Sequence, residues 1–410
     1  MTDIIVIGGG AAGMLAASVA AQQGAQVLLL ERNNRLGKKL SISGKGRCNL
    51  TNDCSVAEVL DNIPTGGLFL QSTINGFPPG SVMQLFQSLG VPLKTERGGR
   101  VFPQTDNASD IVQALTGYLE KTGVKQRRCR AGGILTENQR VCGVMTPAGE
   151  IRSRAVILAT GGLSYPSTGS TGDGYKMANA LGHSISALRG SLAPIVAEPG
   201  LCSRMQGLTL KNVRISVYDG SRKPVFEDFG ELLFTHFGMS GPLALSASAH
   251  MRDPENKKYY ALIDLKPGLD ERKLDLRILR DFEKYANRDF NNALGDLLNR
   301  LMIPVVVEKS GIPPETKVHS ISRGQRLGLV GLLKAFRIDI DGLRPIEEAI
   351  ITSGGVELGE INPKTMESKL VPGLYFAGEI INADAYTGGF NLQIAWSTAY
   401  AAGKAAACRE

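Results

Sequence analysis

Six residues near the N-terminus carry the pattern with the clearest chemical meaning. Residues 8–13, Gly-Gly-Gly-Ala-Ala-Gly, supply GxGxxG between an apolar run at 3–7 and an alanine-rich stretch at 14–23. In a strand–turn–helix unit the first glycine permits the tight turn, the second lets a diphosphate approach the backbone, and the third lets helix and strand pack closely. The N–H groups that open the helix then face the phosphates. The pattern predicts a dinucleotide-binding site.

An acidic residue stands where such a site requires one. Gln26–Leu30 is a second apolar run, and Glu31 follows it, 18 residues after Gly13. A carboxylate at the end of the second strand accepts hydrogen bonds from the two hydroxyls of an adenosine ribose. Glu31 is therefore expected to bind the adenosine end of the cofactor.

Two further glycine turns favour FAD over NAD. Thr160-Gly161-Gly162 follows the apolar run 156–159, and Gly378-Glu379 follows the run 374–377, more than 360 residues after the first glycine. An NAD site does not need so distant a strand end, whereas the ribityl chain and isoalloxazine of FAD extend well beyond the diphosphate. Glu379 is expected to bind this part of the cofactor through its backbone N–H. The alternative is a carboxylate at the start of a helix.

A third glycine turn precedes the final helix. The run 386–393, Tyr-Thr-Gly-Gly-Phe-Asn-Leu-Gln, leads into a helix expected over 391–407. The N–H groups and the positive end of its dipole would favour the negative charge that develops on the flavin pyrimidine edge during reduction. An ordinary capped helix is the alternative.

Residues 32–53 are polar and rich in Gly, Lys and Ser, which predicts a long functional loop without regular structure. Arg47 and Lys38 or Lys39 can neutralise a diphosphate, and Asn49 can offer amide contacts. For each of these residues taken alone, a solvent-facing position is the favoured interpretation. The run Ser-Gly-Lys-Gly-Arg at 43–47, taken as a unit, favours cofactor binding.

Cys48 and Cys54 suggest an alternative chemistry, disulfide reduction by two thiols, of which one attacks and one resolves. Their spacing, CNLTNDC, is one residue longer than in disulfide reductases of the glutathione-reductase kind. A matching His–Glu pair near the C-terminus is missing from the sequence, because the four histidines are at 183, 236, 250 and 319. Two structural thiols are the favoured interpretation.

His236 is the best candidate for proton transfer near a flavin ring, because imidazole titrates in the useful range. A structural histidine in a fixed turn is slightly favoured over this role. Tyr386 and Tyr165 flank cofactor turns and could shape a substrate pocket or simply pack.

The hydrophobic fraction of 43% and the charged fraction of 21% are typical of a globular cytosolic protein. The net charge of +7 is spread along the chain without a block of like charges, which predicts no nucleic-acid or membrane partner. Six cysteines without a CxxC pair are typical of reduced thiols, so a cytoplasmic location is expected. Metal-ligand spacing is absent from the sequence, and the oligomeric state is not determined by it.

The elements that would position these residues follow from periodicity. Helices are expected over 81–90, 107–122 and 270–302, and a small antiparallel meander over 124–160. In residues 190–263 apolar and polar residues alternate as they do in strands. After about residue 345 short apolar runs and glycine turns return. The simplest architecture is one discontinuous α/β domain, 1–190 with 345–410, that holds an inserted region of strands and helices.

Five segments, in chain order, resemble the BaiN/RdsA (YhiN-like) family of NAD(P)/FAD-dependent oxidoreductases: 8–13, 43–52, 234–242, 352–356 and 378–393. The strings SGxGRCNxTN and THxGxSGP are the distinctive ones. The resemblance implies a glutathione-reductase-type FAD-binding Rossmann domain, an inserted β-barrel at 191–265 and 318–344, and a small helical domain at 266–317. Members are linked to bile-acid reduction and to amine oxidation, so the resemblance implies oxidoreduction without a single substrate.

The expected function is hydride transfer between a small organic substrate, or NAD(P)H, and flavin N5. Since a second GxGxxG unit is missing from the sequence, a reduced nicotinamide would dock only transiently. A dithiol reductase and a non-catalytic FAD-binding redox sensor are the alternatives. The candidate catalytic residues are His236 and Tyr386. The expected cofactor-binding residues are Gly8, Gly10, Ala11, Ala12, Gly13, Glu31, Arg32, Lys38, Lys39, Ser43, Gly44, Arg47, Asn49, Thr160, Gly161, Gly162, Gly378, Glu379, Gly389, Asn391 and Leu392.

Overall fold

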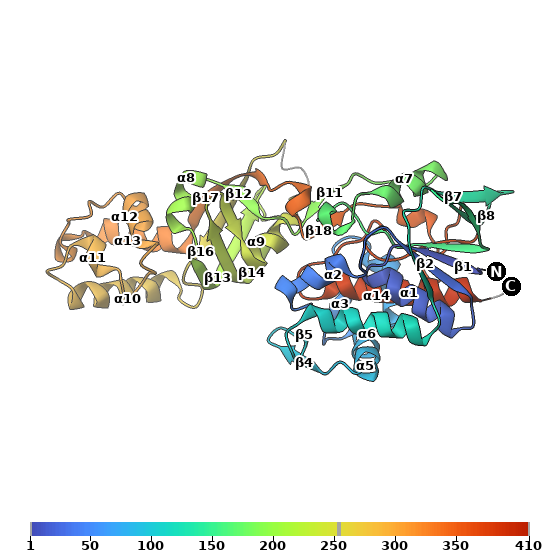
Figure 1. Ribbon diagram of the computed structural model, residues 1–410. Coiled ribbons are helices and arrows are strands. Elements are labelled where there is room, and N and C mark those ends of the chain that lie inside the picture. The colour runs from blue at the N-terminus through green and yellow to red at the C-terminus, as the bar shows by residue number, and fades with distance from the viewer. Residues whose placement is uncertain (1, 252–255, 409–410) are drawn as a thin grey trace. The chain divides into compact units, whose positions relative to one another are not determined.

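The computed structural model describes residues 2–251 and 256–408, which form two compact units. Unit 1 contains the chain up to Ser191 and again from Ile346 onward, and unit 2 is Leu192–Pro345. Figure 1 shows both units, with many of their elements labelled.

A five-stranded parallel sheet forms the centre of unit 1, in the order β19-β10-β1-β2-β6. All residues of β1 and β10 are buried, because helices and loops cover both faces of a parallel sheet. The strands are β1 (Ile4–Ile7), β2 (Val27–Glu31), β6 (Lys125–Arg128), β10 (Ala155–Leu158) and β19 (Leu374–Phe376).

Two helices far apart in the sequence pack together on this sheet: α1 (Ala11–Gln22) and α14 (Phe390–Ala407). Nine residues of α1 in succession are buried, which explains its alanine-rich, weakly amphipathic sequence. The helices come so close that a Cβ on Gly403 would lie 2.5 Å from the carbonyl oxygen of Ala16. The beginning and the end of the chain therefore build one layer.

The smaller elements of unit 1 differ in part from the expectations. The segment 32–53 was expected to be irregular but contains two short helices and a strand. Strand β6 belongs to the central sheet, so the antiparallel meander consists only of β7, β8 and β9. The remaining elements are α2 (Lys38–Ile42), η1 (Ser43–Gly46), β3 (Thr51–Asn52), α3 (Val56–Asp61), α4 (Gly67–Gly76), α5 (Pro79–Ser88), β4 (Leu93–Glu96), β5 (Arg100–Pro103), α6 (Ala108–Lys121), β7 (Gly133–Glu137), β8 (Arg140–Thr146), β9 (Gly149–Arg152), η2 (Pro166–Thr168), α7 (Asp173–Ala180), β11 (Arg189–Ser191), η5 (Ile346–Glu348), β18 (Ile351–Ser353) and η6 (Leu358–Glu360).

Unit 2 contains a closed six-stranded barrel with the order β12-β15-β14-β13-β16-β17. Alternate residues of β16 and β17 point inward, such as Tyr259, Ala261 and Ile263 on β16. A Cβ on Gly238 would lie 2.2 Å from the carbonyl oxygen of Ile195, so this position requires glycine for the strands to pair. The elements are β12 (Ile195–Ala197), α8 (Pro199–Cys202), η3 (Ser203–Met205), β13 (Thr209–Tyr218), β14 (Phe226–Thr235), β15 (Gly238–Ser240), α9 (Gly241–Ser248), β16 (Tyr259–Asp264) and β17 (Phe336–Leu343).

The helical region of unit 2 consists of α10 (Glu271–Lys284), α11 (Phe290–Ala293), α12 (Ile303–Ser310), η4 (Val318–Ser320) and α13 (Arg323–Lys334). Residues 294–302, expected to continue a helix, form turns instead. The helices share one hydrophobic core with the barrel, and α13 packs on α10 although it lies beyond residue 317. The boundary between a barrel and a helical domain therefore stays a prediction.

The predicted fold class is confirmed: a discontinuous α/β Rossmann unit is interrupted by a barrel and a helical region. Within residues 2–251 and 256–408, none of the helices combines the length and apolar character needed to span a bilayer.

Candidate functional site

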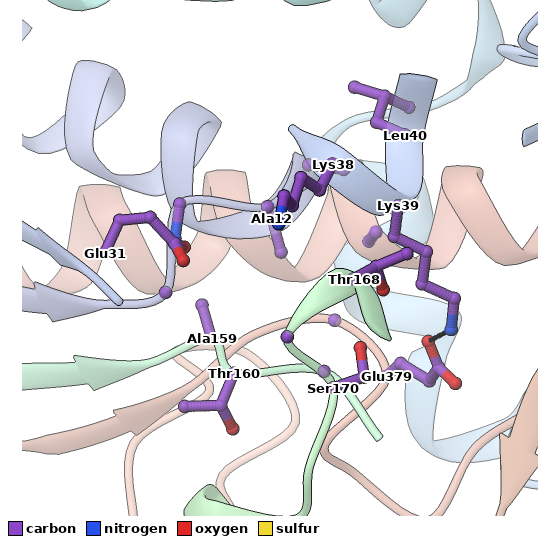
Figure 2. A pocket seen from close by; sticks show the side chains of 18 of the residues that line it. Ala12, Glu31, Lys38, Lys39, Leu40, Ala159, Thr160, Thr168, Ser170 and Glu379 are labelled. Atoms are coloured by element: carbon purple, nitrogen blue, oxygen red, sulfur yellow. Dashed lines mark hydrogen bonds and ion pairs between the residues drawn. The ribbon is translucent and has the colours of Figure 1, made fainter. Parts of the chain in front are cut away.

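A pocket lies along the carboxyl edge of the parallel sheet in unit 1. Its lining follows the ends of β1, β2, β10 and β19, where ligands bind in open α/β sheets. Figure 2 shows this pocket with Glu31 at one end and the pair Lys39 and Glu379 at the other. The expected cofactor residues in its lining are Gly8, Gly10, Ala11, Ala12, Glu31, Arg32, Lys38, Lys39, Ser43, Thr160, Gly161, Gly378, Glu379, Asn391 and Leu392.

The three motif glycines have separable roles. A Cβ on Gly8 would lie 2.4 Å from the carbonyl oxygen of Ala159, and one on Gly13 would lie 1.8 Å from the carbonyl oxygen of Gly8. These two glycines allow the turn, the neighbouring strand and the helix to pack closely. Gly10, by contrast, faces open space in the pocket, with nothing within 4 Å of a Cβ built on it. Only Gly10 has the geometry of close ligand approach.

Glu31 is held in a fixed position at the end of β2. Its two carboxylate oxygens accept hydrogen bonds from the backbone N–H groups of Gly9 and Asn33, each at 2.7 Å. Each oxygen keeps a further lone pair for a ligand hydroxyl. The carboxylate is therefore preorganised as an acceptor.

The segment 163–172, which follows the glycine turn at 160–162, reaches the Glu31 end of the pocket. Asn33 donates from Nδ2 to the carbonyl oxygen of Thr168 at 3.0 Å, and Arg32 donates from Nη1 to Thr171 Oγ1 at 2.7 Å. Arg32 and Arg130 both pair with Asp173. The hydroxyls of this segment line the pocket, which glycine spacing alone does not reveal.

Lys38 is the cation best placed toward the glycine turn. Its side chain extends toward Ala12 at the start of α1 in Figure 2. In the part of the chain that the structure describes, its Nζ forms a hydrogen bond to Asn33 Oδ1 at 3.3 Å and no ion pair. A cation beside a helix N-terminus is suited to a diphosphate.

Lys39 has a different environment from Lys38. Its Nζ lies 2.6 Å from Glu379 Oε2 and 2.6 Å from Ser164 Oγ. Glu379 Oε1 also accepts from Ser164 Oγ and from the backbone N–H of Thr352. The carboxylate of Glu379 thus binds protein groups, and the lysine charge is balanced.

The start of α14 forms the end of the pocket opposite Glu31. Asn391 accepts from the backbone N–H of Ala385 at 2.9 Å and donates to its carbonyl oxygen at 2.7 Å. This fixes the segment that precedes the helix against its first turn. Gly389 serves packing instead, since a Cβ there would lie 2.4 Å from the carbonyl oxygen of Thr51.

Arg47 lies outside the pocket lining, contrary to the expected contact with the diphosphate. Its guanidinium pairs with Glu96 and Asp106 and stacks on the Phe102 ring at 4.1 Å. Hydrogen bonds to these carboxylates raise the pKa of Arg47. The hydrogen bond from Arg47 lowers the pKa of Glu96, and hydrogen bonds from Lys94 and Arg47 lower that of Asp106. The arginine holds β4 and β5 against the preceding loop.

The string RCNLTN docks the final helix. Thr51 Oγ1 donates to Gln393 Oε1 at 2.6 Å, and Trp396 Nε1 donates to the carbonyl oxygen of Leu50 at 2.9 Å. Asn52 donates from Nδ2 to the carbonyl oxygen of Gly388 at 3.1 Å. The motif therefore positions the start of α14 at the pocket.

The two cysteines of this region are poor nucleophiles. Burial raises the pKa of Cys48 to about 12, and burial together with Glu58 and Asp53 raises the pKa of Cys54 to about 11. Thiols with such raised pKa values are poorly activated for nucleophilic attack, which argues against a dithiol mechanism.

Several expected residues do not line the pocket. His236 is exposed and lies in unit 2, between β14 and β15. Tyr386 is half-buried next to the segment that Asn391 holds. The expected cofactor residues outside the lining are Gly13, Gly44, Arg47, Asn49, Gly162 and Gly389.

The pocket fits an extended dinucleotide on three observations. Gly10 leaves space at the helix N-terminus, and Glu31 offers a fixed acceptor at one end. Thr160 Oγ1, on a lining residue, is buried without a hydrogen-bond partner in the part of the chain that the structure describes. Fold and site together define the class: a Rossmann-type oxidoreductase with an FAD-binding fold.

The chain belongs to the family described as HI0933-like protein Rossmann domain, which matches residues 2–405. It is 31% identical over 395 residues to a 3-dehydro-bile acid Δ(4,6)-reductase of Clostridium scindens, covering 94% of this chain and 93% of that protein. It is 30% identical over 400 residues to the ribosomal RNA dihydrouridine synthase of Escherichia coli, covering 97% and 96%. The predicted BaiN/RdsA family is confirmed.

A solved structure shows the same fold. The 3-ketosteroid-Δ4-(5α)-dehydrogenase of Rhodococcus jostii aligns over 99% of this chain and 97% of its own, with a TM-score of 0.55 and 18% identity. At this identity the likeness defines the architecture alone.

Proposed function

We propose that the chain binds FAD in the pocket of unit 1 and transfers hydride between flavin N5 and a small organic substrate or NAD(P)H. The observation that carries the proposal is the continuous lining from Glu31, past the glycine turn, to the N-terminus of α14. Adenosine would lie at Glu31, the diphosphate at Gly10 and Lys38, and the isoalloxazine toward Asn391. FAD supplies the hydride chemistry when bound.

The protein contributes binding, orientation and electrostatics. The N–H groups of the first turn of α1, with Lys38, hold the phosphates. The N-terminus of α14 favours negative charge at the ring end. Asn391 fixes the segment before that helix, so the N–H groups are in place before reduction begins.

The names of the two relatives favour one substrate class. A bile-acid Δ(4,6)-reductase and a dihydrouridine synthase both saturate a carbon–carbon double bond conjugated to a carbonyl. We infer that this chain reduces such a bond. Hydride adds to the β-carbon, a proton adds to the α-carbon, and NAD(P)H restores the hydride in a separate half-reaction.

Because one relative is named for ribosomal RNA, the expectation of no nucleic-acid partner stays a prediction, as does the cytoplasmic location.

The first experiment measures FAD binding, and the second measures the two half-reactions. In the first, protein stripped of cofactor is titrated with FAD, using wild type, Glu31→Gln and, as a surface control, Glu120→Gln. We expect Glu31→Gln to weaken FAD binding about tenfold or more, because a charged acceptor contributes roughly 1.5–3 kcal/mol, and Glu120→Gln to match wild type. A correctly folded wild type with no affinity for FAD would end the proposal.

The loaded protein is then mixed anaerobically with NADH, NADPH, amines and alcohols, and the reduced form with conjugated enones. Reduction by a nicotinamide and reoxidation by an enone are expected. Reduction by an amine alone would make the protein an oxidase. If none of the donors reduces the flavin and none of the acceptors oxidises it, the non-catalytic redox sensor is favoured.

A further inference from the structure

Asp384 is a buried carboxylate whose side-chain partners, in the part of the chain that the structure describes, are two serine hydroxyls. The residue is 2% exposed. Its Oδ2 accepts from Ser191 Oγ at 2.9 Å, and its Oδ1 accepts from Ser353 Oγ at 3.0 Å. In residues 2–251 and 256–408 no lysine, arginine or histidine forms an ion pair with it. Asp384 is not among the expected catalytic or cofactor-binding residues.

Burying a carboxylate in this way costs folding free energy, so the residue is expected to have a role that an apolar side chain could not fill. Burying a carboxylate without a cation loses hydration that two hydroxyls restore only in part. An apolar residue of similar volume would serve a purely structural position at lower cost. The two hydrogen bonds therefore indicate that Asp384 fixes the relative positions of the groups it joins.

The two serines lie on the two connections between unit 1 and unit 2. Ser191 ends β11 and is the last residue of unit 1 before the chain enters unit 2. Ser353 ends β18, soon after the chain returns at Ile346. The strands pair antiparallel with Gly190 opposite Thr352. Each oxygen of Asp384 thus holds one connection.

Asp384 itself belongs to the segment that precedes α14, at the end of the pocket opposite Glu31. Its neighbour Ala383 lines the pocket, and Ala385 is bound by Asn391 in the first turn of α14. On β18, Ile351 also lines the pocket, and the Thr352 N–H donates to Glu379. The connections and the pocket therefore meet at Asp384.

We propose that Asp384 is a positioning residue. Through Ser191 and Ser353 it fixes both connecting strands to the segment that precedes α14. A shift of either connection then displaces the pocket end that Ala383 and Asn391 form. The proposal goes beyond the proposed function, and its first test does not require FAD.

The two hydrogen bonds from Ser191 and Ser353 to Asp384 are called the latch below. Hydrogen–deuterium exchange of the cofactor-free full chain tests whether the latch holds the two connections. In Asp384→Ala, protection of residues 189–191, 351–353 and 382–386 should fall about tenfold or more, because both hydrogen bonds that hold the two strands are lost. Protection of β1 should stay within about twofold, because the change is local. Asp384→Asn should restore protection, because an amide can accept from one serine and donate to the other.

Two results would overturn the proposal. One is protection of both connections in Asp384→Ala that equals wild type. The other is an Asp384→Asn variant as exposed as Asp384→Ala, which would mean that the charge and not the paired hydrogen bonds matters. If Asp384→Ala does not fold, Ser191→Ala and Ser353→Ala should each expose mainly their own strand. Ser153→Ala, a buried serine bonded to Ala155, is the matched control.

A second readout links the latch to the pocket. In FAD-loaded protein the visible circular dichroism of the flavin should change in Asp384→Ala and return in Asp384→Asn. A spectrum unchanged in both, with exchange altered as expected, would contradict the coupling to the pocket while leaving the latch. Failure of all variants and wild type to bind FAD would contradict only the proposed function.

Discussion

Lys39 and Glu379 are 340 residues apart in the sequence, yet Lys39 Nζ lies 2.6 Å from Glu379 Oε2 at the end of the pocket opposite Glu31. Their side chains are 26% and 20% exposed. The pair is therefore screened from water in part, and the two charges largely cancel toward the pocket.

Breaking this pair from either side should shift the potential of the bound flavin in opposite directions. Glu379→Gln leaves the ammonium uncompensated, which stabilises the added negative charge of reduction and raises the midpoint potential. Lys39→Met leaves the carboxylate uncompensated and lowers it. Shifts of about 30 mV, equal to about 1.4 kcal/mol for two electrons, are expected in dye-equilibrated reduction.

The double variant Lys39→Met with Glu379→Gln controls for lost packing and should return close to the wild-type potential. Two single variants that shift the potential in the same direction would show that the charges do not act on the flavin. Lys38→Met should mainly weaken FAD binding, because Lys38 is directed toward the diphosphate end.

Gly10 and Gly13 should fail in different ways when replaced by alanine. Gly13→Ala places a Cβ against the carbonyl oxygen of Gly8, so we expect the free energy of unfolding to fall by about 3 kcal/mol or more. Gly10→Ala meets no atom within 4 Å and should cost at most about 1 kcal/mol as an N-cap change. Its FAD affinity should still fall more than about tenfold. Urea unfolding of cofactor-free protein and FAD titration separate the two effects; a Gly10→Ala variant that binds FAD normally would contradict the placement of the diphosphate.

Replacing Cys48 or Cys54 by serine should leave both half-reactions within about twofold of wild type. With pKa values of about 12 and about 11, less than about one thiol in a thousand is ionised at pH 7.5. Stopped-flow rates and the slow reaction of the native thiols with a disulfide reagent provide the check. Loss of turnover in Cys54→Ser with FAD still bound would revive the dithiol alternative.

The parts of the site that the sequence predicts are those encoded locally. Strand, glycine turn, helix and Glu31 follow one another within 31 residues, so spacing alone places them. The helix α2 was missed because Leu40 is its only buried residue, which leaves no periodic apolar signal. Its start at Gly37, with φ 64°, looks like a loop in the sequence.

Long-range pairing limits the rest. Arg47 carried a charge suited to a phosphate, but nothing in its neighbourhood showed that Glu96 and Asp106 would bind it first. The same holds for Asp384, whose partners lie 193 and 31 residues away. In the sequence Asp384 is simply an acid near a glycine turn, and its role depends on two strands, β11 and β18, that only the fold brings together.

His236 remains the predicted proton-transfer residue, and its replacement should separate the half-reactions. In His236→Gln, reduction of the flavin by NAD(P)H should stay within about twofold. Reoxidation by an enone should slow by about 10²-fold or more, the usual contribution of a general acid. His319→Gln, at another exposed histidine of unit 2, is the matched control. Equal rates in both variants would leave His236 as a structural residue of the turn.

His183 should make the stability of unit 1 depend on pH. Its side chain is fully buried, with Nδ1 2.9 Å from Glu360 Oε2 and Nε2 2.8 Å from Ser368 Oγ. Burial lowers the pKa of His183 below its ordinary 6.5, although the hydrogen bond and charge of Glu360 oppose the shift. The unfolded chain therefore binds this proton more readily, so the contribution is present above pH 6.5 and is lost as the pH falls below it.

Glu360 acts in a lower pH window. Burial opposes its ionisation, but hydrogen bonds from Ser184 and His183 outweigh burial and lower its pKa below 4.5, so its contribution is lost only under more acid conditions. Urea unfolding at pH 7.5, 6 and 5 should show a slope of up to about 1.4 kcal/mol per pH unit from His183. His183→Gln should flatten this slope, whereas His319→Gln should not. A wild-type stability that rises between pH 7 and 5 would mean that His183 is protonated in the folded chain, because the attraction of Glu360 would then outweigh burial.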